Sequence, residues 1–481
     1  MLAIALGACS FAPPLRIPDV PVANSYKEAA PWTLARPADD LPRDAWWTLY
    51  GDTDINALQK RLIKNSPDLA AALARFQQAK AFRDQARSGL FPVLAGSANA
   101  QRDRQSALKP LRVLGPNSPD EYGFYTLGVE MDYEFDVWGR IRNQVAAGAA
   151  SERAAQADLE SARLSLQAQL ADSYIALRGL DREVALLNDT VAAYAKALEL
   201  STTRHTGGIA SGLDIARAQT QVDATRSQAT QAFAQRALLE HAIAALVGES
   251  ASKFTIESRL VDILLPQIPA GVPSALLQRR PDIAAAQRRI AAANASIGVA
   301  RAAFFPAVTL SALAGYQSSD SGNFISAPNT YWSVGPSLFL TLFDAGKRKA
   351  EVARTQAVLD ETGATYRSIV LNAFQQVEDN LALLNQYRAA AESERSALGA
   401  AQRSLDFATT RYREGAVNYL EVVTSQTVTL QAQRNALDLE TRQRRASVQL
   451  IRALGGGWSA SAAPLALAGS CAEGGCRDGS Q

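Results

Sequence analysis

The chain has 481 residues, with 49 basic side chains, 47 acidic side chains and 2 histidines, which gives a formal net charge of +2. This length allows two or three ordinary domains. The balance of charges gives no reason to expect nucleic acid as a partner, and interspersed charges are typical of solvated helix faces. No run of about 18 or more apolar residues is present, so no transmembrane helix is expected.

The first candidate site is a cysteine near the N-terminus. Residues 6–8 form a short apolar run that ends in small residues before Cys9. This pattern resembles the lipobox of bacterial lipoproteins, in which the cysteine is acylated; a chance cysteine in a truncated leader is the alternative. Residues 1–8 are then expected to be the remainder of a signal peptide with a trimmed or misassigned start, because they contain no basic residue.

An extended arm is predicted next. Seven prolines lie between residues 10 and 45, and this composition favours a segment that crosses a surface. The run from Trp46 to Asp52 then opens the first helical region. We therefore expect residues 9–50 to form a lipid-anchored arm.

The rest of the chain contains a tandem repeat. At a shift of 214 residues, Pro281-Asp282-Ile283 aligns with Pro67-Asp68-Leu69, and Phe305-Pro306 aligns with Phe91-Pro92, with no gap between the matches. Two matches in unbroken register indicate a duplicated unit. In each copy, apolar residues spaced by three and four predict a helix that ends before the second proline. A weak strand is predicted after it near residues 93–102, and alternating residues predict a strand near residues 307–317.

The clearest strand signal covers residues 124–137. One face is apolar and partly aromatic, and the other carries four carboxylates. Such a row favours a strand that faces water inside a barrel and lipid outside; a half-buried strand of a soluble protein is the alternative. The second copy repeats the pattern over residues 331–343, where Pro336 predicts a bulge or a local cost. The four acids are Glu130, Asp132, Glu134 and Asp136.

Each return strand leads into a very long helix. Residues 140–205 and 347–412 would each span roughly 100 Å at about 1.5 Å per residue. Glycine-containing turns follow at residues 206–212 and 414–419, and helices return over residues 213–247 and 420–454. The predicted organisation is residues 1–8, residual signal peptide; 9–50, arm; 51–248, first repeat; 249–272, equatorial linker; 273–455, second repeat; and 456–481, an equatorial or disordered tail that contains Cys471 and Cys476.

Four strands per chain cannot close a barrel, and open strand edges are not tolerated in lipid. If the strands span a membrane, the barrel must therefore be shared between chains. Eight strands from two chains and twelve from three both satisfy the even-number tendency. Twelve strands leave the wider lumen, and the helices would continue the tube.

The sequence resembles the TolC/OprM-like outer membrane efflux channels, in particular their lipoprotein, NodT-type branch. The resemblance implies a mixed α and β membrane protein, in which each chain supplies four strands of a trimeric 12-stranded outer membrane β-barrel. A long periplasmic α-helical barrel continues it and docks to a periplasmic adaptor and an inner-membrane pump. The segments that carry the resemblance are residues 6–9, 46–52, 135–142, 279–317 and 410–426, together with the repeat.

In this family the periplasmic tip is the closed end of the channel. The family's Tyr-Arg pair before the second turn matches Tyr412 and Arg413, for which a solvated turn residue is the alternative role of the arginine. Where the family often has an aspartate, this chain has Thr424, which cannot form an acidic ring. Hydroxyl hydrogen bonds, or Asp214 and Glu421 nearer the turns, are expected to substitute.

Further site residues follow from the repeat and the resemblance. His205 occupies the place of Tyr412 in the first copy, where it is either a pH-sensitive gate residue or an exposed bystander. The four acids of residues 130–136 would bias the lumen toward cations. The turn tips, where the family's adaptors dock, are Gly208, Ile209, Ala210, Gly415, Ala416 and Val417.

An enzyme is the main alternative of another class, and the residues argue against it. Only two histidines are present, with no nucleophile elbow, phosphate loop or cluster of metal ligands. No catalytic residue, metal or cofactor is therefore expected. The leading hypothesis is a passive exit duct of a tripartite efflux pump for small molecules or ions. The alternatives are the exit duct of a type I protein secretion system and a soluble helical scaffold.

Overall fold

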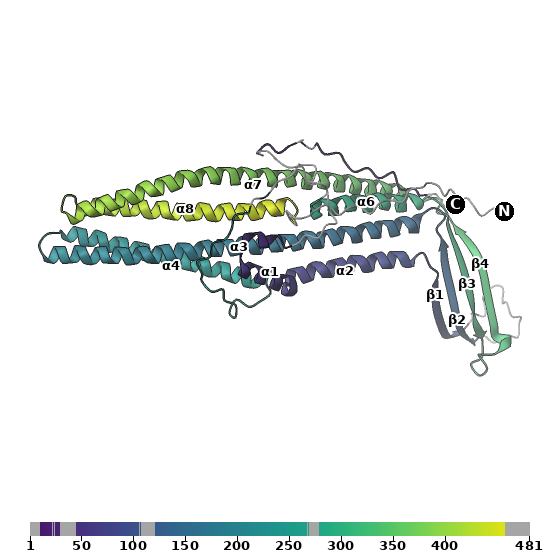
Figure 1. Cartoon of the computed structure of the whole chain (residues 1–481). Helices are drawn as coiled ribbons and strands as arrows, with labels where there is room; N and C mark the ends of the chain where they lie inside the picture. Colours follow the sequence, from purple (N-terminus) through teal and green to yellow (C-terminus); the bar gives the residue numbers. More distant parts are fainter. Residues whose placement is uncertain are drawn as a thin grey trace, which may run out of the picture.

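The computed structural model describes residues 10–21, 23, 25–28, 45–104, 106, 121–266, 268 and 279–456. Cys9, the predicted signal-peptide remainder and the tail after Gly456 lie outside these residues. The molecule is elongated, with long helices side by side and a sheet at one end (Figure 1). None of the described helices has the length and apolar character needed to cross a membrane.

The two repeats have matching elements. The long helices α3 and α7 each contain 67 residues, and the returning helices α4 and α8 each contain 35. The bounds are η1 Trp46–Tyr50, α1 Thr53–Asn65, α2 Pro67–Ser88, β1 Val93–Arg104, β2 Glu121–Phe135, α3 Arg140–Thr206, α4 Gly212–Leu246, α6 Pro281–Ala302, β3 Ala307–Ser318, η2 Ala327–Asn329, β4 Thr330–Phe339, α7 Lys347–Arg413 and α8 Tyr419–Ala453.

The strands form one antiparallel sheet in the order β1-β2-β3-β4. The strand predicted over residues 331–343 ends earlier, at Phe339, because Phe339 pairs with Ala307, the first residue of β3. The bulge expected at Pro336 is not present in this described stretch, where the register runs through Leu310 and Pro336 without interruption. Within the protomer β4 is an edge strand of the sheet, a position in which proline is found.

The register places the apolar residues of both hairpins on one face. Val129 lies opposite Ala314, and Ala314 lies opposite Trp332. Directly paired residues of neighbouring strands point to the same side of a sheet. The apolar positions of β2 and β4 therefore share one face, and Glu130 and Asp132 lie on the other.

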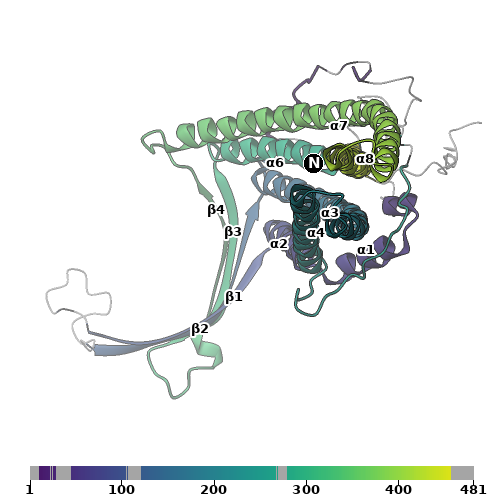
Figure 2. The same ribbon diagram turned by 90° about the vertical axis from the view of Figure 1, so that its left-hand side faces the viewer.

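The helices that adjoin the sheet follow the same order as the strands. Helix α2 packs on α3, α3 on α6, and α6 on α7. Figure 2 shows these helices beside one another and the sheet curving away from them. The hairpins α3–α4 and α7–α8 extend to the end opposite the sheet (Figure 1). Strands and helices thus form a single curved row with two free sides.

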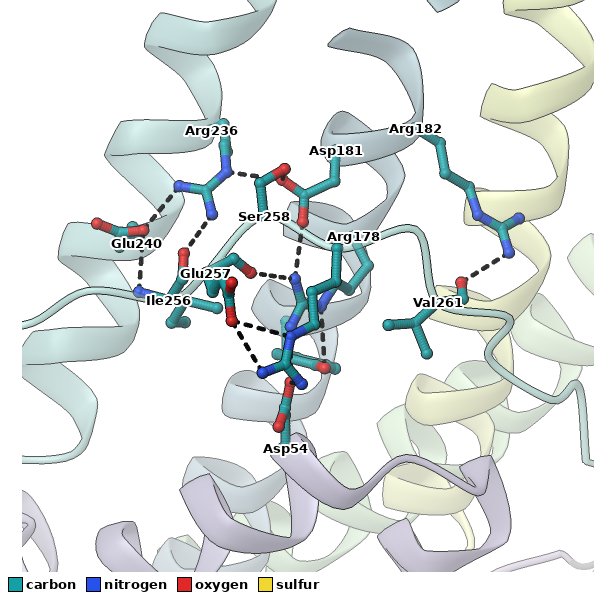
Figure 3. A network of polar contacts seen from close by, with 12 residues as sticks. Asp54, Arg178, Asp181, Arg182, Arg236, Glu240, Ile256, Glu257, Ser258 and Val261 are labelled. Atoms are coloured by element: carbon teal, nitrogen blue, oxygen red, sulfur yellow. Dashed lines mark hydrogen bonds and ion pairs between the residues drawn. The ribbon is translucent and has the colours of Figure 1, made fainter. Parts of the chain in front are cut away.

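A buried ionic network joins the helices at mid-height. The Arg178 side chain is only 2% exposed, and its guanidinium donates to Asp181 at 2.8 Å and to Asp54 at 2.9 Å. Arg236 of α4 donates to the other oxygen of Asp181 at 2.7 Å, and Ser258 also donates to Asp181 (Figure 3). Asp181 is therefore the shared acceptor that links α3, α4 and the following segment.

Arginines also hold the segment after α4 through its backbone. Carbonyl oxygens of residues 256, 257, 261 and 263 accept hydrogen bonds from four arginine side chains at 2.5–2.8 Å. Because this segment is irregular, its carbonyls lack sheet or helix partners, and charged donors satisfy them. The donors are Arg236, Arg178, Arg182 and Arg444, the last from α8.

Replacement of Asp181 tests this network. Asp181→Ala would leave Arg178 and Arg236 buried without their shared carboxylate, so we expect it to lower the free energy of unfolding by about 3–5 kcal/mol. The matched control is Asp223→Ala, which removes an exposed ion pair with Arg226 and should cost about 0–1 kcal/mol. The measurement is the loss of helical circular dichroism in detergent; equal effects of the two substitutions would contradict the structural role of Asp181.

Candidate functional site

The two turns at the end far from the sheet have equivalent backbones. Gly208 and Gly415 adopt φ values of 75° and 77°, a region that glycine enters without strain. The next residue in each turn donates its N–H at 2.8 Å to the carbonyl of Arg204 or Arg411, five residues earlier. The repeat is therefore preserved at the tips, with an offset of 207 residues.

The predicted docking residues lie together on these turns. The Ile209 side chain is 78% exposed, and Gly208, Gly415 and Ala416 are also exposed. A Cβ atom added at either glycine would have no neighbour within 4 Å. The tips thus present small and apolar groups, which suit a contact surface; their docking role stays a prediction.

Tyr412 lies inside the protomer, between the two hairpins. It is 7% exposed, and its ring centroid is 5.2 Å from that of Tyr419. Ala218 of α4 and Val422 of α8 belong to the same buried cluster. Burial raises the pKa of Tyr419 to about 12, and the nearby Tyr412 and Asp214 act in the same direction. The Tyr412 ring therefore packs the two hairpins against each other.

The other predicted gate residues have polar partners other than one another. Thr424 donates to Leu420 of its own helix at 2.9 Å. Asp214 forms a capping box with Ser211 at the start of α4. The Glu421 carboxylate lies 3.9 Å from Arg411, and the His205 ring contacts the carbonyl of Ala210 in its own turn at 2.8 Å. Each of these four side chains has its partner within its own hairpin. Thr424 and Glu421 both line a surface groove of about 610 Å³ between α7 and α8.

Arg204 is a tip residue that sequence reasoning missed. It lies in the last turn of α3, and its guanidinium donates to the carbonyls of Tyr412 and Arg413 in the other hairpin, at 2.8 and 2.7 Å. The Arg413 side chain, in contrast, is exposed. The repeat alignment, which pairs Arg204 with Arg411, was the available signal, but it could not show that one arginine crosses to the other hairpin.

The predicted row of four acids is divided by its contacts. Asp136 lies just beyond the end of β2, and its carboxylate accepts the N–H groups of Ile141 and Arg142 at the start of α3, at 3.0 and 2.8 Å. Glu134 is paired with Arg140. Asp132 accepts a hydrogen bond from Ser311, and Glu130 is exposed. Glu134 and Asp136 thus contact residues at the sheet–helix junction, and Glu130 and Asp132 lie farther along β2.

The N-terminal arm docks at this junction. The Phe11 ring stacks on Phe305 at 4.4 Å, and Phe305 stacks on Trp138 at 4.9 Å. The Ser10 hydroxyl donates to Asn143 of α3 at 3.0 Å. The residue that follows Cys9 therefore lies where the strands meet the helices.

The aromatic stack can be tested through access to the arm. Phe11→Ala removes the ring that stacks on Phe305, a contact worth about 0.5–1.5 kcal/mol beyond its burial. We expect proteases to cleave the arm faster in this variant. Leu15→Ala, at a side chain that is 50% exposed, is the control and should leave the cleavage rate unchanged. Equal rates in all three proteins would show that the stack does not hold the arm.

Comparisons with known proteins agree with this architecture. The family described as "Outer membrane efflux protein" matches residues 58–249 and 272–456, which overlap the two repeats. The chain is 30% identical to outer membrane protein OprJ of Pseudomonas aeruginosa, over 95% of each chain. It is 33% identical to the pyoverdine export outer membrane protein OpmQ of the same organism, over 96% of each. The solved structure of the outer-membrane channel OprN is 30% identical and matches with a TM-score of 0.84, covering 94% of this chain and 100% of OprN.

Proposed function

Because the chain belongs to the outer membrane efflux protein family, we propose that its sheet and helices form one third of a continuous duct with a gate at the helical tip. The chain is the outer membrane channel component of a tripartite efflux pump, and it is not an enzyme. Channels of this family are trimeric and work with a periplasmic adaptor and an inner-membrane pump.

The observation that carries the duct is the single curved row with two free sides. Among the described residues, the strands at its free sides are β1 and β4, and the helices there are α2 and α7. Head-to-tail contacts of this kind close into a ring when the rotation between copies permits it. Three copies would join twelve strands, with the helices continuing the wall.

The two faces of the sheet support different surroundings. Trp332, Val334 and Leu338 on the apolar face of β4 are 76%, 59% and 67% exposed, which suits contact with lipid. Glu130 and Asp132 lie on the opposite face and would line the lumen, where they favour cations. Passage of small molecules or ions would then be controlled at the tip, where adaptor docking is also proposed.

A charge introduced on each face of β4 tests this orientation. Val334→Lys places an ammonium on the proposed lipid face and should cost about 2–4 kcal/mol near mid-depth, so that less protein assembles in outer membranes. Ser333→Lys, one residue earlier, points to the lumen and should assemble normally. The amount of assembled protein in purified outer membranes is measured; equal assembly of both variants would refute the proposed orientation.

We also propose that Cys9 is acylated. The support is the docked position of Ser10, which would bring an acyl chain on Cys9 to the membrane-proximal end of the helices. Cys9→Ser should abolish incorporation of labelled palmitate, whereas Ser10→Ala should retain it. Mass spectrometry of the mature N-terminus checks the result, and an unmodified cysteine in the wild-type protein would contradict the anchor.

A further inference from the structure

The Arg204 side chain makes polar contacts between the two hairpins of the protomer at their tips. Nη1 of Arg204 donates to the carbonyl of Tyr412 at 2.8 Å, and Nη2 donates to the carbonyl of Arg413 at 2.7 Å. The guanidinium also lies over the Tyr412 ring, 4.7 Å from its centroid. Arg204 thus makes three contacts, all with the last turn of α7.

The acceptors are suited to a cation. The last carbonyls of an α-helix have no intrahelical partners and carry the negative end of the helix dipole. A guanidinium presents a rigid fork of donors, so it can engage two carbonyls at once. Its stacking on Tyr412 adds a cation–π contact. The Arg204 side chain therefore fits the end of α7 in both charge and shape.

This contact is specific to one copy of the repeat. Arg411 occupies the position of Arg204 in the second copy, and the backbones of the two turns match. Among its described contacts, however, the Arg411 side chain reaches Glu421 in its own hairpin, at 3.9 Å. The contact between hairpins therefore does not follow from the repeat itself and depends on Arg204.

Arg204 lies closer to the exposed turns than the other described contacts between the two hairpins. The buried cluster around Tyr412 and Tyr419 joins the hairpins directly beneath it. Farther inward, Tyr194 donates to the carbonyl of Gln426 and Gln221 donates to the Thr427 hydroxyl, each at 3.1 Å. Beyond Arg204 lie the exposed turns. Movement of the α7–α8 tip away from the α3–α4 tip would thus have to break the Arg204 contacts.

We propose that Arg204 is the positioning residue that holds the α7–α8 tip against the α3–α4 tip and so keeps the channel closed. This inference rests on the proposed gate at the helical tip. It assigns the closing contact to backbone acceptors at the end of α7, and not to the side chain of Arg413. Because the acceptors are backbone carbonyls, this contact does not require an acidic side chain as its partner.

The test is the ion conductance of the full-length purified channel in planar lipid bilayers. Arg204→Ala removes two charged hydrogen bonds and a ring contact, and we expect it to raise the fraction of time spent open by roughly tenfold or more. Arg204→Gln, which cannot reach both carbonyls, should show a smaller increase. Arg411→Ala is the matched control from the second copy and should conduct like the wild type. Thermal stability and protomer number are measured in parallel, because a merely structural role would change these without opening the channel.

The outcomes separate this inference from the proposed gate. Tyr412→Ala removes the buried ring between the hairpins, so it should open the channel if the tip is the gate. If Tyr412→Ala opens it and both Arg204 variants conduct like the wild type, the role of Arg204 is refuted. If the wild-type channel is already fully open and no variant changes its conductance, the tip gate itself is refuted. Should Arg204→Ala fail to assemble, wild-type conductance of Arg204→Gln would overturn the inference.

Discussion

The outer edges of β1 and β4 set the main physical constraint on this protein. Within the described part of the chain, the sheet ends at these two strands, so their outward N–H and C=O groups need partners from elsewhere. In hydrocarbon each unsatisfied group costs several kcal/mol. The helices follow the same open row, with α2 and α7 at its ends. A single rotation that joins copies head to tail would therefore complete both the sheet and the helical wall.

Arginine side chains bind backbone carbonyls at two levels of the structure. At mid-height, four arginines fasten the irregular segment after α4 to helices of both repeats. At the tip, Arg204 fastens the last turn of α7 to α3. Such contacts satisfy carbonyls that helices and strands leave unpaired. They also depend little on the side chains of the segment that is bound, because the acceptors are backbone groups.

Sequence periodicity was enough to predict the mixed fold, the duplicated helices and strands, and the turns at Gly208 and Gly415, because these features depend on local patterns. Contacts between distant segments were not accessible in this way. The gate role expected for Tyr412 stays a prediction, but its burial between the hairpins could not be foreseen, since it depends on how α7 meets α4. Asp136 continues an alternating pattern but caps α3, because a carboxylate beside a helix N-terminus is stabilised by free N–H groups. Arg204 has no local signature at all.

The central claim is that the open row closes by joining three copies. The most direct measurement is the number of chains in the protein extracted from outer membranes, obtained from its mass in detergent after subtraction of bound detergent. The account predicts three chains, which supply twelve strands. Two chains would give an eight-stranded barrel with too narrow a lumen for export, and a monomer would leave both edges open. Either result would contradict the duct.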